Sequence, residues 1–200
     1  MSVANSISSL TIKPTAAQAG ATLAVRVGTA AFAAVVSGRD SLALPLNVGE
    51  NRIEVRVVAE NTTSSQVYSL VVTRAPSAEA RLGALAFSPS GLLPFFSTNL
   101  QNYALNVSST TANLTLTSAT TLAAPLGTIS YKWNDGSRVD GAATLSNVVF
   151  PVLVGSNTLK LWVTAQDGVT TTETTVSVVR PVPPAPEIVV EQLGLSLIHI

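Results

Sequence analysis

Hydrophobic and polar residues alternate along two stretches of the chain that lie 106 residues apart. In residues 51–58 three aliphatic side chains alternate with charged ones, and residues 158–164 repeat the alternation with Leu159, Leu161 and Val163. A period of two places successive side chains on opposite faces of a strand. Both stretches are therefore predicted to be strands with one face in solvent.

Turn-forming residues border both predicted strands. A Val-Gly-x-Asn run starts at Val48 before the first strand and at Val154 before the second. Gly and Asn tolerate the positive φ values that such turns require. After each strand comes another polar turn and then a closing strand, residues 67–73 in one copy and 174–179 in the other. The sequence thus predicts the same hairpin twice.

The similarity extends to the segments that precede each hairpin. Residues 22–27 align with residues 128–133 at the same offset of 106, and residues 10–12 align with residues 114–116 at an offset of 104. Short alternating strands separated by turns are typical of sandwiches and barrels, and self-similarity at a fixed period indicates tandem modules. We therefore predict an all-β protein built from two tandem antiparallel β-sandwich modules.

Proline-containing segments follow both closing strands. Proline cannot donate to a sheet ladder, so the strands are expected to end before Pro76 and Pro181. The predicted organisation is a first module (1–75), a linker (76–80), a complete second module (81–180), a Pro-rich linker (181–186) and the start of a further module (187–200). The last six residues, from Leu195, resemble translated sequencing-adapter read-through; the alternative is an ordinary apolar strand.

Alternation also selects a core for the second module. The predicted core residues are Leu85, Phe87, Tyr103, Leu105, Leu114, Leu116, Ile129, Tyr131, Trp133, Leu159, Leu161, Val163, Val176 and Val178.

Composition supports strands and excludes several functions. Charged residues make up 11% of the chain, against roughly 25% in an average soluble protein, so the surface must be built from Thr, Ser, Asn and Gly. The 11 basic and 11 acidic residues are dispersed and leave no basic patch for nucleic acid. No apolar run reaches the roughly 18 residues that span a bilayer, so no membrane insertion is expected. The absence of cysteine excludes disulfides and cysteine-bound metal.

The order of these motifs resembles the bacterial cadherin-like β-sandwich repeat family, an immunoglobulin-like fold. Its pattern opens with a segment rich in Gly, Leu, Pro and Phe, matched by residues 91–96, and continues to a strand tyrosine, Tyr103. A Gly-x-Asn turn, an Ala-x-Asp-Gly turn at residues 165–168 and a closing strand that ends in Arg180 complete it. Thr174 departs from the family, which usually has an aromatic residue there; the first module keeps Tyr68. The resemblance implies large secreted or surface proteins and no catalytic activity.

The first module is expected to lack the opening segment of this pattern. The offset of 104 that aligns residues 10–12 with 114–116 makes Val3 the equivalent of Val107. About 25 residues of the opening segment, including the counterpart of Tyr103, then have no equivalent in the first module. We expect the first module to have fewer strands and a lower stability than the second.

No arrangement of residues suggests catalysis. The single histidine, His199, lies in the terminal tail, so a Ser-His-Asp arrangement is excluded. Asp135, Asp140 and Asp167 each precede a glycine, which is typical of turns. The alternative is a Ca²⁺ loop at residues 134–141, but its spacing lacks the dense acidic ladder of calcium loops. We predict no enzyme activity, no metal site and no cofactor.

One aromatic residue is a candidate for binding. Trp162 is predicted to point outward on the same face as Lys160, because its equivalent in the first module is Arg56. An outward tryptophan can stack on a sugar ring or a partner surface; the alternative is a tryptophan covered by a neighbouring loop. Trp162 and Lys160 are therefore the candidate ligand-binding residues.

Two functions remain open at this point. The first is a non-catalytic structural and adhesive module of a large bacterial secreted or cell-surface protein, whose partners are neighbouring modules of the same chain, with surface glycans or proteins as further candidates. The second is a carbohydrate-binding accessory module of a secreted enzyme, which rests on Trp162 alone. Either function places the protein outside the cell or on its surface.

Overall fold

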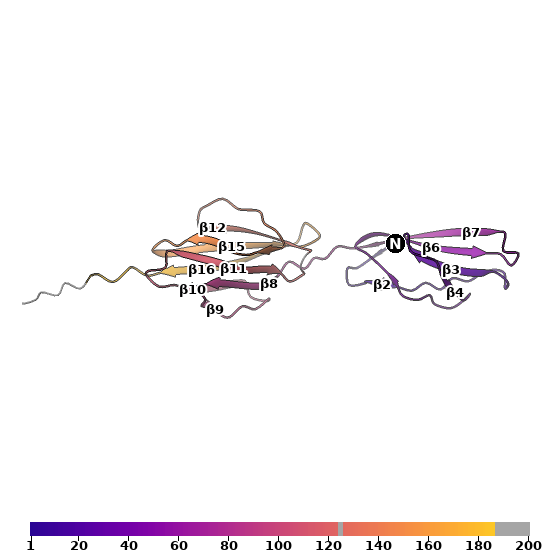
Figure 1. Ribbon diagram of the computed structural model, residues 1–200, viewed down its shortest axis with the longest axis horizontal. Coiled ribbons are helices and arrows are strands. Elements are labelled where there is room, and N and C mark those ends of the chain that lie inside the picture. The colour runs from indigo at the N-terminus through magenta and orange to yellow at the C-terminus, as the bar shows by residue number, and fades with distance from the viewer. Residues whose placement is uncertain (124–125, 187–200) are drawn as a thin grey trace, which may run out of the picture. The chain divides into compact units, whose positions relative to one another are not determined.

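Strands make up the regular secondary structure of the computed structural model, which describes residues 1–123 and 126–186 (Figure 1). The first module contains β1 (Ser2–Val3), β2 (Ser9–Leu10), β3 (Thr22–Val27), β4 (Ala33–Val35), β5 (Leu44–Pro45), β6 (Gly49–Val58) and β7 (Ser65–Arg74). The second module contains β8 (Leu82–Ser88), β9 (Leu92–Leu93), β10 (Asn102–Asn106), β11 (Asn113–Thr121), β12 (Thr128–Trp133), β13 (Thr144–Leu145), β14 (Val148–Pro151), β15 (Gly155–Thr164) and β16 (Thr171–Arg180). The prediction of an all-β fold is confirmed.

Each module has a larger sheet in a similar strand order. In the first module this five-stranded sheet runs β1-β7-β6-β3-β4, and in the second it runs β12-β15-β16-β10-β9. The second layers differ in size. β8, β11, β13 and β14 form a four-stranded sheet in the second module, whereas the first module has only the two-stranded sheet β2-β5.

The chain divides into two compact units near the predicted linker. One comprises Met1–Ala80 with Thr164–Thr171, and the other comprises Arg81–Val163 with the described residues that follow Thr171. The exact module and linker boundaries stay predictions. The predicted further module, 187–200, and its last six residues lie outside the described residues.

In each module one strand ladder differs from the predicted antiparallel pairing. β10 runs parallel to β16, with Asn102 opposite Thr175 and Asn106 opposite Val179. β1 runs parallel to β7 in the equivalent register but covers only Thr73 and Arg74. Alternation reports which face a side chain occupies and carries no information on strand direction, so this arrangement could not be deduced from it.

The Val-Gly-x-Asn turns have the same structure in both modules. Gly49 and Gly155 adopt φ values of +90° and +94°, which L side chains rarely occupy. Asn51 and Asn157 are buried, and each uses its side-chain amide to bind the N–H and C=O of the residue four positions earlier, at 2.8–3.0 Å. The sequence analysis assigned both residue types to backbone freedom, yet the asparagine acts through its side chain.

The closing arginines are also equivalent. Arg180 donates to the backbone carbonyls of Ser109 and Val152 at 3.0 and 2.8 Å. Arg74 makes the corresponding contacts in the first module at 2.7–2.9 Å. A guanidinium group that joins two loops to the end of the closing strand explains why both modules end in arginine.

The predicted core of the second module is largely confirmed. The residues found buried are Leu85, Phe87, Tyr103, Leu105, Leu114, Leu116, Ile129, Leu159, Leu161, Val163, Val176 and Val178. Tyr131 and Trp133 are only partly buried, which corrects their placement in the core. They pack at the border of the core against Phe150, with ring centroids 5.6 and 4.9 Å away.

The first module has a smaller core, formed by Val25, Leu44, Leu46, Ile53 and Val72.

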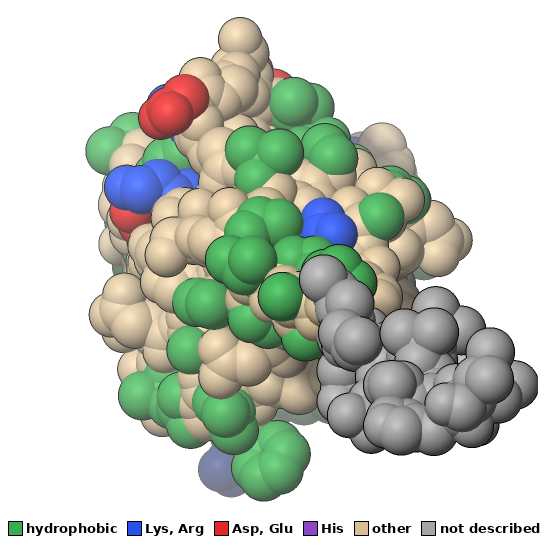
Figure 2. Space-filling model, turned by 90° about the vertical axis from the view of Figure 1, so that its left-hand side faces the viewer, with side chains coloured by type: hydrophobic (Ala, Val, Ile, Leu, Met, Phe, Trp, Pro, Cys, Tyr) green, Lys and Arg blue, Asp and Glu red, His purple; other side chains and the backbone are tan. Residues whose placement is uncertain are grey.

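No helix in the described part of the chain has the length and apolarity needed to cross a membrane. The face drawn in Figure 2 carries few charged side chains among many apolar and uncharged ones, as the low charged fraction predicts.

Candidate functional site

Trp162 and Lys160 lie together on the outward face of β15, where a single carboxylate joins them. Glu173 on β16 accepts a hydrogen bond from Lys160 Nζ at 2.8 Å and another from the Trp162 indole N–H at 2.8 Å. The hydrogen bond from Lys160, together with that from Trp162 and the positive charge of the lysine, lowers the pKa of Glu173 below its usual value. Glu173 is therefore an anion over the neutral pH range and fixes the orientation of the indole ring.

Arg138 covers one face of this indole ring. Its guanidinium carbon lies 4.7 Å from the ring centroid, which is a cation–π contact. The guanidinium group also donates a hydrogen bond of 3.0 Å to the hydroxyl oxygen of Ser130, which holds it in this position. Part of the ring is thus covered by the loop between β12 and β13, as the alternative in the sequence analysis described. A sugar that stacks on the covered face must first displace Arg138.

Sequence reasoning missed both Arg138 and Glu173. The pairing of residues across the hairpin could have predicted the position of Glu173, because a turn centred on Asp167 and Gly168 brings residue 173 opposite Trp162. Arg138 lies in a loop with no counterpart in the repeat, so no pattern in the sequence predicts its position over the ring.

Asp167, one of the three aspartates that precede a glycine, stabilises the turn in which it lies. Asp167 accepts hydrogen bonds from the Thr170 hydroxyl and from the N–H groups of Val169 and Thr170, and these bonds lower its pKa. Asn61 caps the equivalent turn of the first module by accepting from two N–H groups. Within residues 1–123 and 126–186 no group of three His, Asp or Glu side chains is placed to hold a metal ion.

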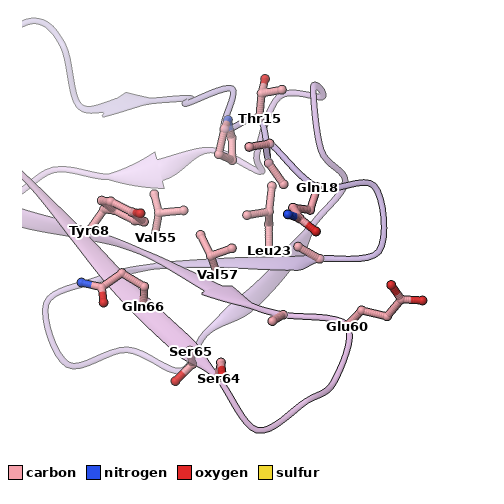
Figure 3. Close-up of a pocket in the computed structure, with 15 residues that line it drawn as sticks. Thr15, Gln18, Leu23, Val55, Val57, Glu60, Ser64, Ser65, Gln66 and Tyr68 are labelled. Carbon is pink, nitrogen blue, oxygen red and sulfur yellow. The ribbon is translucent and has the colours of Figure 1, made fainter.

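A second candidate site lies on the inner face of the larger sheet of the first module. It is a groove of about 850 Å³, bounded by β3, β6 and β7 on one side and by residues 14–18 on the other. Figure 3 shows Leu23, Val55 and Val57 projecting from the sheet toward the loop that carries Thr15 and Gln18. Glu60, at the rim, is the only charged residue among those that line the groove.

The groove continues into an exposed apolar strand. Tyr68 and Leu70 on β7 share the inner face with Val55, and they are 61% and 40% exposed. The sequence analysis expected a module short of strands but did not identify this groove. Phe32 packs against the guanidinium groups of Arg26 and Arg56 at 4.4 Å on the opposite face.

Comparison with protein families assigns the chain to one family. The model described as "Cadherin-like beta sandwich domain" matches residues 1–75 and again residues 82–181. The chain therefore belongs to the family of cadherin-like β-sandwich domains, and the resemblance found in its sequence is confirmed. A search of curated protein sequences gives no match.

Solved structures with related folds are distant. Chicken VE-cadherin EC1-2 is 12% identical, with a TM-score of 0.32, and the match covers 92% of this chain and 97% of that one. The SGBP-B protein of a Bacteroides ovatus mixed-linkage glucan utilization locus, solved in complex with a mixed-linkage heptasaccharide, is 12% identical with a TM-score of 0.30. That match covers 90% of this chain, which spans 65% of the Bacteroides protein. With TM-scores this low, neither likeness bears on what the chain does.

Proposed function

We propose that the chain is a non-catalytic structural and adhesive segment of a large bacterial protein that is secreted or exposed on the cell surface. The observation that carries this proposal is the repetition of the same internal anchors. Each module has its own buried asparagine at the hairpin turn and its own arginine at the end of the closing strand. Modules with their own cores and their own anchored ends can be joined in series by linkers, as independent domains are.

The linkers support the same role. Residues 181–186 contain four prolines, and proline-rich segments act as semi-rigid spacers of about 3 Å per residue. In this proposal the partners are neighbouring modules of the same chain, and adhesion uses the outward faces of the sheets.

A reach assay tests the spacer role. The chain is placed between a surface anchor and a binding domain of known specificity on bacterial cells, and the capture of target-coated beads is counted. We expect capture to fall when the second module is deleted and also to fall when the whole chain is replaced by a flexible Gly/Ser linker of equal residue number. Equal capture with all three would contradict a spacer function.

A carbohydrate-binding accessory module is the second candidate, and the cluster around Trp162 favours it. An aromatic ring beside an ammonium and a carboxylate group offers both stacking and hydrogen bonding to a sugar. A glycan array probed with the full chain decides between the two candidates. Selective retention that is lost with Trp162→Ala and increased with Arg138→Ala would establish a stacking platform and reject a spacer without ligands.

A further inference from the structure

The outer face of the larger sheet in the first module gathers three arginines. Arg26 on β3 lies opposite Glu54 on β6, and Arg52 and Arg56 lie two residues to either side of Glu54 on the same strand. Residues two apart on a strand point to the same side of the sheet. Three guanidinium groups therefore share one face, although the basic residues are dispersed along the sequence.

Each of these guanidinium groups is held in place by a neighbour. Glu54, which is only 8% exposed, accepts a hydrogen bond from Arg26 Nε at 2.7 Å and forms an ion pair with Arg52 Nε at 3.1 Å. The ring of Phe32 lies against the other two contacts, with its centroid 4.4 Å from the guanidinium carbons of Arg26 and Arg56. A ligand that binds here loses little side-chain freedom, because the donors are already oriented.

The charges on this part of the face are not balanced. Among the described residues, Glu54 is the only carboxylate that forms an ion pair with the three arginines. Glu50 shares the face but lies six residues from Arg56 on β6, about 20 Å along the strand. Three positive charges and one negative charge leave an excess of two positive charges. The guanidinium group of Arg56 is exposed and contacts only an aromatic ring, so its N–H donors can bind an anion.

The cation–π contact alone does not indicate a ligand, because it occurs in both modules. In sequence the loop between β12 and β13 has no counterpart in the first module, but the bridge from β12 to Val139 repeats the pairing of β3 with Ala33. Arg138 therefore occupies the place of Phe32, and a cation–π contact holds this loop to the outer face in each module. Arg138 also forms an ion pair of 3.5 Å with Asp140. The contact is structural, whereas the guanidinium group without a carboxylate partner is found in the first module.

Exposed valines lie beside two of the arginines. Val67 on β7 is opposite Arg56, and Val71 is opposite Arg52; the two valines are 42% and 41% exposed. The same arginine–valine pair thus occurs twice, four residues or about 13 Å apart along the strand. The equivalent residues of β16 are exposed as well, although β10 pairs with β16. Exposure of this outer face therefore does not depend on a neighbour at the edge of β7.

We propose that this surface, formed by Arg26, Arg52, Arg56, Val67 and Val71 and called the arginine face, binds an acidic polysaccharide whose sugar rings carry carboxylate groups. The proposal rests on the adhesive role proposed above and names the partner. The polysaccharide lies along β6, where successive carboxylates reach Arg56 and Arg52.

The chemistry of the arginine face favours a polyuronate over other anions. The planar fork of a guanidinium group binds a carboxylate through two parallel N–H···O hydrogen bonds. A uronate ring holds its carboxylate at a fixed distance from an apolar C–H face, which matches an arginine next to an exposed valine. The carboxylates of an acidic peptide lie on flexible side chains and bring no such apolar face.

The experiment measures binding of the chain of 200 residues to immobilised polygalacturonate by biolayer interferometry, with dextran as the neutral polymer and polyglutamate as the acidic peptide. We expect saturable binding that weakens at least about threefold between 50 and 200 mM salt, because exposed charges are screened. Monomeric galacturonate at an equal carboxylate concentration should not compete, since it cannot contact both arginine–valine pairs at once. No binding to polygalacturonate, or binding to dextran or polyglutamate that is as tight, would overturn the proposal.

Matched variants locate the site. Arg56→Gln should weaken binding at least about tenfold, and Arg56→Lys should have an intermediate effect, because the charge remains but the fork is lost. Lys13→Gln removes one positive charge from an exposed residue that follows β2 in the other layer, and it should change binding by less than about twofold. Circular dichroism of each variant checks that the sheet is intact.

Three results would refute the arginine face: unchanged binding with Arg56→Gln, an equal loss with Lys13→Gln, or a loss with Trp162→Ala in its place. The reach assay distinguishes this failure from failure of the spacer role. A chain that does not bind polygalacturonate but still extends the reach of capture keeps the spacer role and loses the acidic polysaccharide as its partner.

Discussion

Leu70 and Val176 occupy equivalent positions on the closing strands of the two modules, yet Leu70 is 40% exposed and Val176 is fully buried. The same contrast separates Tyr68 from Thr174 and Val57 from Val163. The turns and the closing arginines, in contrast, are almost identical in the two modules. The modules therefore share the framework that sets their strand register, and they differ in the layer that covers the inner face of the larger sheet.

The largest expected difference is in global stability. We expect the first module to unfold at a lower urea concentration than the second, with a free energy of unfolding lower by about 3–5 kcal/mol, because its aliphatic face lacks aromatic and aliphatic cover. Fragments 1–76 and 77–186, expressed separately and unfolded in urea, measure the difference. A first fragment that unfolds cooperatively and is as stable as the second would remove the contrast.

Substitutions of equivalent valines test whether the uncovered face causes the lower stability of the first module. Val163→Ala should cost about 2–3 kcal/mol, because the side chain is 1% exposed and its removal leaves a cavity. Val57→Ala should cost less than about 1 kcal/mol, since its equivalent side chain already borders the groove. Hydrogen exchange followed by mass spectrometry in the intact chain assigns each loss to its module. Equal losses would show that Val57 is packed in solution.

The turn asparagines belong to the framework that both modules share, so their substitution is expected to affect the two modules equally. Asn51→Ala and Asn157→Ala should destabilise their modules equally, by about 1–2 kcal/mol, because each removes the two hydrogen bonds that a buried side chain makes to the turn backbone, at Asn47 in one module and Leu153 in the other. Hydrogen exchange followed by mass spectrometry measures the loss of stability in both variants. If Asn51 contributed nothing, the shared framework would be incomplete in the first module and the contrast would extend beyond the inner face.

The smallest effect is expected on the outer face, where Glu173 has only Val67 as its equivalent. Glu173→Gln should lower the stability of the second module by about 0.5 kcal/mol or less, because exposed ion pairs are screened by solvent. The pKa of Glu173 is lowered from 4.5 in the folded state. Its stabilisation is therefore full above pH 4.5 and is lost as the pH falls through the lowered pKa. Urea unfolding of both proteins at several pH values should show the difference disappearing in acid; a constant difference would contradict the assignment.

The repeat made much of the fold predictable. A period of two selected twelve of the fourteen predicted core residues correctly, because a strand buried on one face must alternate. Tyr131 and Trp133 were placed on the correct face of β12. They are only partly buried, and alternation does not report how far the second sheet covers that face. Trp162 and Lys160 were correctly grouped on one face, and this grouping follows from the same parity.

Local sequence patterns predict the alternating strands, the turns and the existence of two similar modules, since these follow from local periodicity and from residues whose backbone preferences are local. Tertiary structure decided which strands lie side by side and in which direction, as in the parallel ladder of β10 and β16. It also decided that Arg138 covers Trp162 and that a groove remains between β6 and residues 14–18. These features arise where distant segments meet, and the free energy of such contacts depends on shape and coverage that no local pattern encodes.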